Sequence, residues 1–159
     1  MIRVDVANRQ RLLRINRKRL AAAVRRALEL AGRDRAEVSL AVVDDATIAQ
    51  LHGQYLGDPS PTDVLSFLLE CGPAGLEGEV IVSAETASDY AARFGWSPAD
   101  ELLLYVVHGT LHLAGYRDAT AEQRNEMRKQ ERAVLKLFKL HPCYRARTTV
   151  RTACPPLRK

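Results

Sequence analysis

Two histidines, His108 and His112, lie four residues apart in a strongly apolar stretch of the chain. If this stretch is helical, both imidazoles lie on one face, one turn apart, and can reach the same metal ion. A single histidine in a core usually has a structural role, but two at this spacing beside a predicted helix end favour a metal site. The same spacing occurs in the His-Glu-x-x-His motif of zinc peptidases, where the glutamate is the general base. Gly109 occupies that position here and cannot take a proton, which argues against a peptidase.

A catalytic zinc site needs a third protein ligand and one open position, where a water molecule can be activated. Gly115 allows the chain to turn back after the helix, and Asp118 is then the best placed candidate. The alternative is that Asp118 caps a helix or a turn, while Arg117 would be repelled by a cation. We therefore expect one zinc ion held by His108, His112 and Asp118, with a site charge of about +1.

The helix that must carry the two histidines has clear start and stop signals. Ser97 can cap it, Pro98 suits its first turn, and Gly115 is a natural stop. Between them the residues are apolar on nearly all sides, which predicts a buried central helix.

The rest of the chain alternates between strand-like and helix-like patterns. The glycines that follow residue 71 are expected to break the chain before Val80, and the two strands on either side of that break form a hairpin-like pair. We predict strands near residues 2–6, 39–43, 64–69 and 80–82, and helices near residues 16–31, 46–55, 84–94, 98–113 and 120–138.

Charge is distributed very unevenly along the 159 residues. Residues 1–35 hold 11 Lys/Arg and 3 Asp/Glu. Residues 36–123 hold only 2 Lys/Arg but 14 Asp/Glu, and residues 124–159 hold 11 Lys/Arg and 2 Asp/Glu. Basic ends around an acidic middle argue for a polyanionic partner. Arg17, Lys18 and Arg25 lie on the predicted first helix, where they form either a solvated face or a phosphate-binding stripe.

Several protein classes are excluded by composition. The longest apolar run, Leu102–Val107, is far shorter than the ~20 residues of a membrane span, and the charged start does not resemble a signal peptide. We therefore expect a cytoplasmic protein without membrane association. Cys71, Cys143 and Cys154 do not form a disulfide framework, although the last two could pair or bind a metal in the tail.

Three ordered motifs resemble the YbeY family of bacterial endoribonucleases. The stretch His108–Tyr116 resembles the signature of the family, and Pro61–Phe67 and Gly78–Ala87 resemble two further blocks. Met127 and Glu131 match the spacing of the last helix. The resemblance spans about residues 1–138. We predict one domain over residues 1–140, followed by a tail over residues 141–159 that is basic and lacks periodicity and is therefore expected to be mobile.

This resemblance implies both a fold and an activity. The fold is α+β, with a mixed four-stranded sheet packed with helices and a central metal-binding helix. The activity is that of a zinc-dependent, single-strand-specific endoribonuclease, which matures ribosomal RNA near the 3′ end of the small-subunit RNA and takes part in ribosome quality control. Ribosomal RNA and the small ribosomal subunit are the implied partners, and no nucleotide cofactor is expected.

The sequence departs from the family pattern at two positions. The family motif ends in Gly-Tyr-Asp-His and its last histidine is a ligand, so the third ligand falls on Asp118 here. The family also has an arginine after the tyrosine of the loop helix, where this chain has Leu56 after Tyr55. Leu56 cannot hold a phosphate, and Arg117 is a candidate replacement cation.

Two other functions fit the same residues. The chain could be a ribosome-associated RNA-binding factor whose metal is structural, with weak or no catalysis. It could also be a metal-dependent hydrolase of another substrate, such as a peptide, although Gly109 argues against that.

Overall fold

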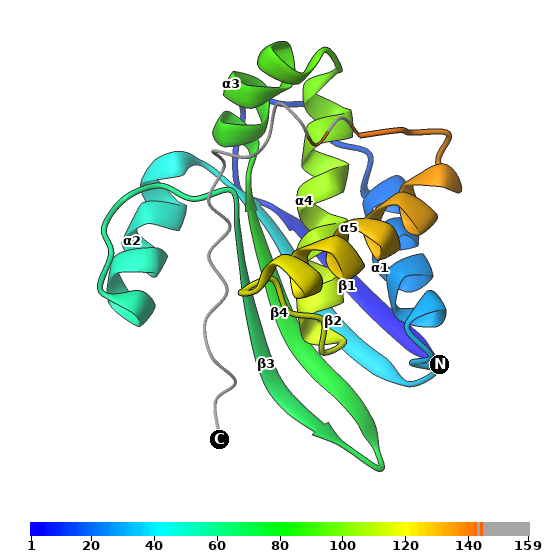
Figure 1. Ribbon diagram of the computed structural model, residues 1–159. Helices are drawn as coiled ribbons and strands as arrows, with labels where there is room; N and C mark the ends of the chain where they lie inside the picture. Colours follow the sequence, from blue (N-terminus) through cyan, green and yellow to red (C-terminus); the bar gives the residue numbers. More distant parts are fainter. Residues whose placement is uncertain (143, 145–159) are drawn as a thin grey trace.

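The computed structural model describes residues 1–142 and residue 144, which form an α+β fold with one mixed sheet. Figure 1 shows the arrangement of its elements. In chain order these are β1 (Ile2–Asn8), α1 (Arg17–Leu30), β2 (Ala36–Val43), α2 (Asp45–Leu56), β3 (Val64–Gly72), β4 (Gly75–Ser83), α3 (Ala84–Phe94), α4 (Pro98–Leu113) and α5 (Ala121–Lys136).

The sheet has the strand order β1-β2-β4-β3. β1 pairs with β2 and β2 pairs with β4 in parallel, whereas β3 and β4 form an antiparallel hairpin closed at Gly72 and Gly75. The predicted mixed four-stranded sheet and the predicted hairpin-like pair are both confirmed.

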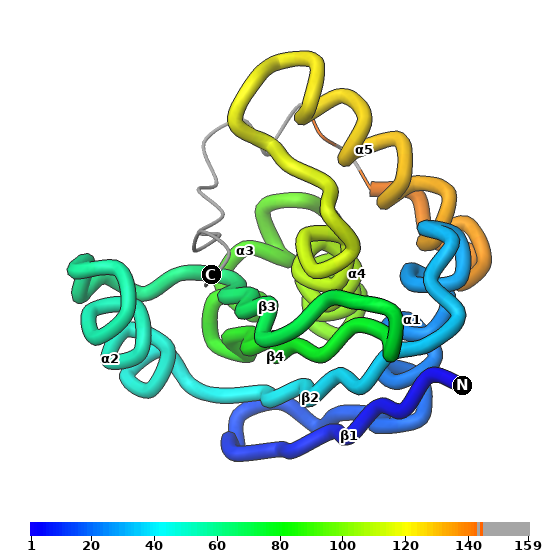
Figure 2. Tube along the Cα trace, turned by 90° about the horizontal axis from the view of Figure 1, so that it is seen from below, coloured from blue at the N-terminus to red at the C-terminus, as the bar shows by residue number. Residues whose placement is uncertain are grey.

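The main core lies between the sheet and the helices on one of its faces, as the view from below shows (Figure 2). α4 is at its centre, and every residue from Glu101 to Val107 on this helix is buried. Ser97 accepts a hydrogen bond from the Asp100 backbone N–H and Pro98 occupies the first turn, as predicted. The apolar sequence of α4 therefore reflects contacts on all its sides, with the sheet, α1, α3 and α5.

A second, smaller apolar cluster lies on the opposite face of the sheet. Ile48 of α2 packs there with Val43, Leu65, Phe67 and Ile81 from the strands. Leu56, at the end of α2, is partly buried against the same cluster. This position is therefore used for packing on the face opposite α4.

β4 begins earlier than the sequence predicts, at Gly75, and Gly78 lies inside it. The prediction that Gly78 breaks the chain is wrong because this glycine has a packing role. A Cβ atom at Gly78 would lie 2.8 Å from Cδ2 of Leu113, the last residue of α4. The glycine lets the end of the histidine helix lie directly on the strand.

The predicted tail lies mostly outside the described residues, and so do Cys143 and Cys154. Cys71 is exposed and has a free thiol. In the described part of the chain, no helix is both long enough and apolar enough to cross a membrane.

Candidate metal centre and its pocket

The two histidines lie near the C-terminal end of α4, with their rings in edge-to-face contact at a centroid distance of 4.6 Å. Immediately after α4 the chain reverses at Gly115, whose φ of +108° is a conformation that favours glycine. The Tyr116 N–H donates to the Leu111 carbonyl and secures this reversal. The chain then runs back past the helix end and brings Asp118 to the histidines.

Three donor atoms converge at this point. Oδ2 of Asp118 is 3.3 Å from Nε2 of His108 and 3.3 Å from Nε2 of His112. The two Nε2 atoms are 2.9 Å apart. Zinc ligands at 2.0–2.1 Å in tetrahedral geometry are separated by about 3.3 Å. Two imidazoles and one carboxylate at these separations fit a metal ion such as zinc.

Glu131 of α5 holds His108 from the other side. Its Oε1 is 2.5 Å from Nδ1 of His108, so the imidazole donates its Nδ1–H to the carboxylate and presents Nε2 to the site. The other oxygen, Oε2, accepts a hydrogen bond from the Tyr144 hydroxyl. A carboxylate behind a metal-binding histidine fixes its tautomer and orientation, and Glu131 is placed to do so.

The electrostatics of the cluster reflect this close packing of charges. Burial alone would lower the pKa of His108, but the Glu131 carboxylate, with Asp118 and Asp63, raises it to about 10. Burial would raise the pKa of Asp118, but hydrogen bonds from His108 and His112 outweigh burial and hold it well below its usual range. Without an ion, this cluster therefore holds a protonated His108 beside an ionised Asp118.

A third carboxylate, that of Asp63, faces the same space from the residue before β3. It is 4% exposed and accepts hydrogen bonds from the Val64 N–H and the Thr62 hydroxyl. Burial raises its pKa to about 6, against the opposing effect of His108. Asp63 belongs to one of the motifs noted in the sequence, but no local pattern indicates that its side chain meets the histidine helix.

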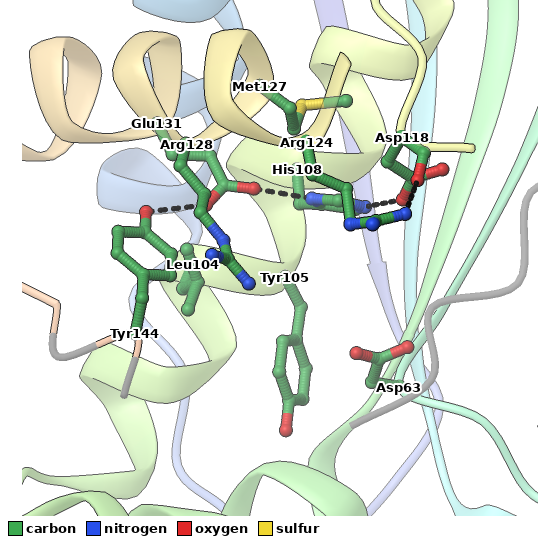
Figure 3. Close-up of a pocket in the computed structure, with 10 residues that line it drawn as sticks. All are labelled: Asp63, Leu104, Tyr105, His108, Asp118, Arg124, Met127, Arg128, Glu131 and Tyr144. Carbon is green, nitrogen blue, oxygen red and sulfur yellow. Dashed lines mark hydrogen bonds and ion pairs between the residues drawn. The ribbon is translucent and has the colours of Figure 1, made fainter. Parts of the chain in front are cut away.

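These groups line a pocket of about 250 Å³ between α4, α5 and the start of β3 (Figure 3). Arg124 and Arg128 of α5 project into it, and sequence reasoning did not single them out. They could have been identified from their helical spacing with Met127 and Glu131, because this spacing places all four residues on one helix face. The lining residues are Asp63, Leu104, Tyr105, His108, Asp118, Arg124, Met127, Arg128, Glu131 and Tyr144.

The cations predicted to bind RNA lie elsewhere, because none of them lines this pocket. Lys18 and Arg25 are exposed on α1, and Arg17 donates to the Val6 carbonyl at 2.9 Å. Arg117 is exposed beside the chain reversal. The structure thus brings together the three predicted ligands, whereas none of the four predicted RNA-binding residues lines the pocket beside them.

Gly109 faces the sheet rather than the pocket. A Cβ atom there would lie within 2.9 Å of Val64, Val80 and Ser66 side-chain atoms. The Ser66 hydroxyl donates to the Gly109 carbonyl at 2.8 Å. The position of the peptidase glutamate is therefore closed to a longer side chain by packing, which removes the structural basis for a peptidase.

Comparisons with known proteins identify the family. A family model described as Endoribonuclease YbeY matches residues 5–139. The chain belongs to this family. An Endoribonuclease YbeY from Rhodopirellula baltica is 44% identical over 124 residues, covering 77% of this chain and 64% of that relative, so the match spans somewhat less than two thirds of the relative's own length. Another YbeY protein, from Moorella thermoacetica, is 44% identical over 111 residues, covering 63% of this chain and 71% of the relative.

A solved structure supports the fold. The solution structure of a Thermotoga maritima protein matches with a TM-score of 0.58 at 28% identity, covering 87% of this chain and 92% of the other. The resemblance to the YbeY family inferred from the sequence motifs is thus confirmed, together with the α+β fold.

Proposed function

We propose that this chain is a metal-dependent endoribonuclease that cleaves single-stranded RNA in the pocket between α4 and α5. The observation that carries the proposal is the convergence of the His108, His112 and Asp118 donor atoms beside a pocket lined by two arginines, in a chain of the YbeY family. Its substrate would be ribosomal RNA near the 3′ end of the small-subunit RNA, its partner the small ribosomal subunit, and its location the cytoplasm.

The proposed ligands of one zinc ion are Nε2 of His108, Nε2 of His112 and a carboxylate oxygen of Asp118. When bound, the ion supplies a Lewis acid that polarises a phosphoryl oxygen and lowers the pKa of a coordinated water. Two neutral imidazoles and one carboxylate leave about one positive charge at the site.

The residues around these ligands have distinct tasks in this proposal. Glu131 holds the His108 ring by its Nδ1–H. The Asp63 carboxylate, which lines the same pocket, accepts the proton that the 2′-hydroxyl loses as it attacks phosphorus, while the bond from phosphorus to the 5′-oxygen breaks and that oxygen leaves with a proton from water. Its pKa of about 6 leaves it ionised but basic near neutral pH, as a general base requires, and a bound cation would lower that pKa and keep the carboxylate charged.

The activity is tested with purified protein and a single-stranded RNA that carries the 3′ end of small-subunit ribosomal RNA. We expect cleavage that a chelator abolishes and added zinc restores, and that is lost in His112→Ala. His141→Ala is the matched control, because His141 is exposed beyond α5. Zinc-loaded protein that shows no chelator-sensitive cleavage would overturn the nuclease assignment and leave an RNA-binding factor with a structural metal.

The ligand set is tested separately by elemental analysis. His108→Ala and His112→Ala should each lose most of the bound zinc, and Asp118→Ala should lose most of it as well. Full zinc retention in Asp118→Ala would show that the third ligand is a different residue.

A further inference from the structure

Arg124 and Arg128 are two cations that the fold places in the pocket without neutralising them. Within the described residues neither forms an ion pair, whereas Arg19 on α1 pairs with Asp100. The acid nearest in sequence on the same helix face, Glu131, already uses one oxygen for His108 and the other for Tyr144. The positive charge of α5 in the pocket is therefore available to a ligand.

Both guanidinium groups are held in place by neighbours that do not cancel their charge. Nη1 of Arg124 donates to the Ala119 carbonyl at 3.0 Å and to the Asp118 carbonyl at 3.4 Å. The Arg128 guanidinium lies over the Tyr144 ring, 5.1 Å from its centroid. Guanidinium groups bind phosphate through parallel N–H donors, and held ones lose less side-chain entropy on binding.

Their placement on the helix brings two like charges together in the pocket. Arg124 and Arg128 are one turn apart on α5, where like charges repel. In Figure 3 both side chains reach from α5 toward the space above Tyr105 and Asp63, on the same side as the His108–Asp118 pair. An anion bound between the two guanidinium groups would relieve the repulsion and lie beside the metal ligands.

We infer that Arg124 and Arg128 form a phosphate subsite that holds the backbone of single-stranded RNA beside the metal centre. This inference rests on the proposed function, and it names the residues that position the strand. The subsite recognises phosphodiester groups and not bases, because a guanidinium contact to phosphate carries no sequence information.

The test measures RNA binding rather than cleavage. The zinc-loaded full-length protein is titrated against a fluorescein-labelled single-stranded 2′-O-methyl RNA, which keeps the phosphates and lacks the free 2′-hydroxyl. We expect Arg124→Gln and Arg128→Gln each to weaken binding about five- to tenfold at low salt. Each should also flatten the dependence of log K on log salt by about 0.7, the value for one phosphate contact to a single strand.

The matched control is Lys129→Gln, which removes one charge from an exposed position on the same helix outside the pocket. Equal losses in Lys129→Gln and the two arginine variants would overturn the subsite, and so would unchanged binding in the arginine variants. Zinc content is measured in each variant, because Arg124 contacts the loop that holds Asp118. Among the described residues, no hydrogen bond or ion pair joins Arg128 to that loop, so Arg128→Gln decides the question if Arg124→Gln loses zinc.

Failure of this subsite and failure of the nuclease proposal give different results. Chelator-sensitive cleavage by the parent protein with unchanged binding in the arginine variants would refute the subsite alone. Arginine-dependent binding without cleavage of unmodified RNA would refute the nuclease and leave the phosphate subsite in place.

Discussion

Glu131 supports the candidate metal centre although its side chain would not touch the ion. It is 3% exposed, and its carboxylate is engaged by both His108 and Tyr144. The first of these contacts sets which ring nitrogen of His108 is free to bind a metal. The last helix therefore contributes to the chemistry of α4 as well as to the core.

Glu131→Gln should lower zinc affinity about 10- to 100-fold, because the neutral amide is a poorer acceptor for the His108 Nδ1–H. A competition titration against a zinc indicator measures the affinity. Glu122→Gln, an exposed position on the same helix, should leave it unchanged. Unaltered affinity in Glu131→Gln would mean that the His108 ring is held by packing alone.

Zinc uptake should depend steeply on pH. In the metal-free protein the pKa of His108 is raised to about 10, and a zinc ligand must be deprotonated. Zinc affinity should therefore rise about tenfold per pH unit through the neutral range, with release of about one proton per ion. Calorimetry in buffers of different ionisation enthalpy measures the number of protons released per zinc ion. A number near zero would contradict the assignment of His108 as a protonated ligand in the metal-free protein.

The same shift predicts the stability of the metal-free protein. The pKa of His108 is higher in the folded chain than the ordinary 6.5, so its protonation stabilises the fold fully below that value. The stabilisation is lost as the pH rises toward about 10. Urea denaturation with chelator present should show this decline, and the decline should be absent in His108→Gln.

At the level of elements, the positions of the helices were largely predictable from local signals. The range 84–94 was correct at both ends, because Ser83 caps the start and Gly95 adopts the left-handed conformation at the end. The capping box of Thr120 and Gln123 likewise marks the start of α5. Such signals are contained within one turn of the chain, so they can be read without knowing the fold.

The features that could not be predicted depend on contacts between distant elements. The sequence alone suggests that Gly78 breaks the chain, and its packing role is evident only from its close approach to Leu113 of α4. The three proposed metal ligands lie within a few residues of each other, so the sequence alone indicates that they meet, whereas Asp63 reaches the pocket from another element. The role of Arg124 and Arg128 could not be predicted, because the sequence does not show that their face of α5 is turned toward α4.

The contact between α4 and the sheet yields a prediction about stability. Gly109→Ala should destabilise the fold by about 1–3 kcal/mol, because the new methyl group would overlap Val64 and Val80. This loss opposes the gain in helix propensity, which favours alanine over glycine by about 1 kcal/mol. Urea denaturation measures the free energy of unfolding.

Gly53→Ala provides the matched control for that measurement. Gly53 is also helical, but a Cβ there would make only ordinary contacts of 3.4–3.7 Å with Pro59. We expect this variant to be neutral or slightly stabilised. Equal stability changes at the two glycines would show that α4 can move away from the sheet.

On the scale of the whole molecule, the candidate metal centre brings together side chains from three segments of the chain. His108 and His112 belong to α4, Asp118 to the returning chain, and Glu131 to α5. An ion bound there would hold these segments together, so zinc binding and folding should be thermodynamically linked.

Free zinc at about 100 times its Kd should raise the free energy of unfolding by about 2.7 kcal/mol. Denaturation with urea at fixed zinc concentrations gives this difference. His112→Ala should show a much smaller gain, while His141→Ala should behave like the parent protein. A gain of equal size in His112→Ala would place the stabilising zinc at a different site.

The strand order has a consequence for how the chain is assembled. β3 is made before β4, yet β4 occupies the place beside β2, so β3 has no neighbour in the sheet until the next strand exists. A ribosome that has released only the first 74 residues therefore exposes a nascent strand with its backbone groups unpaired. We expect the β3–β4 hairpin to form first and to join β2 as a unit, because its contacts are the most local in the sheet. The synthesis of this protein thus passes through a stage that is open to aggregation or to chaperone binding, and that stage ends when β4 emerges.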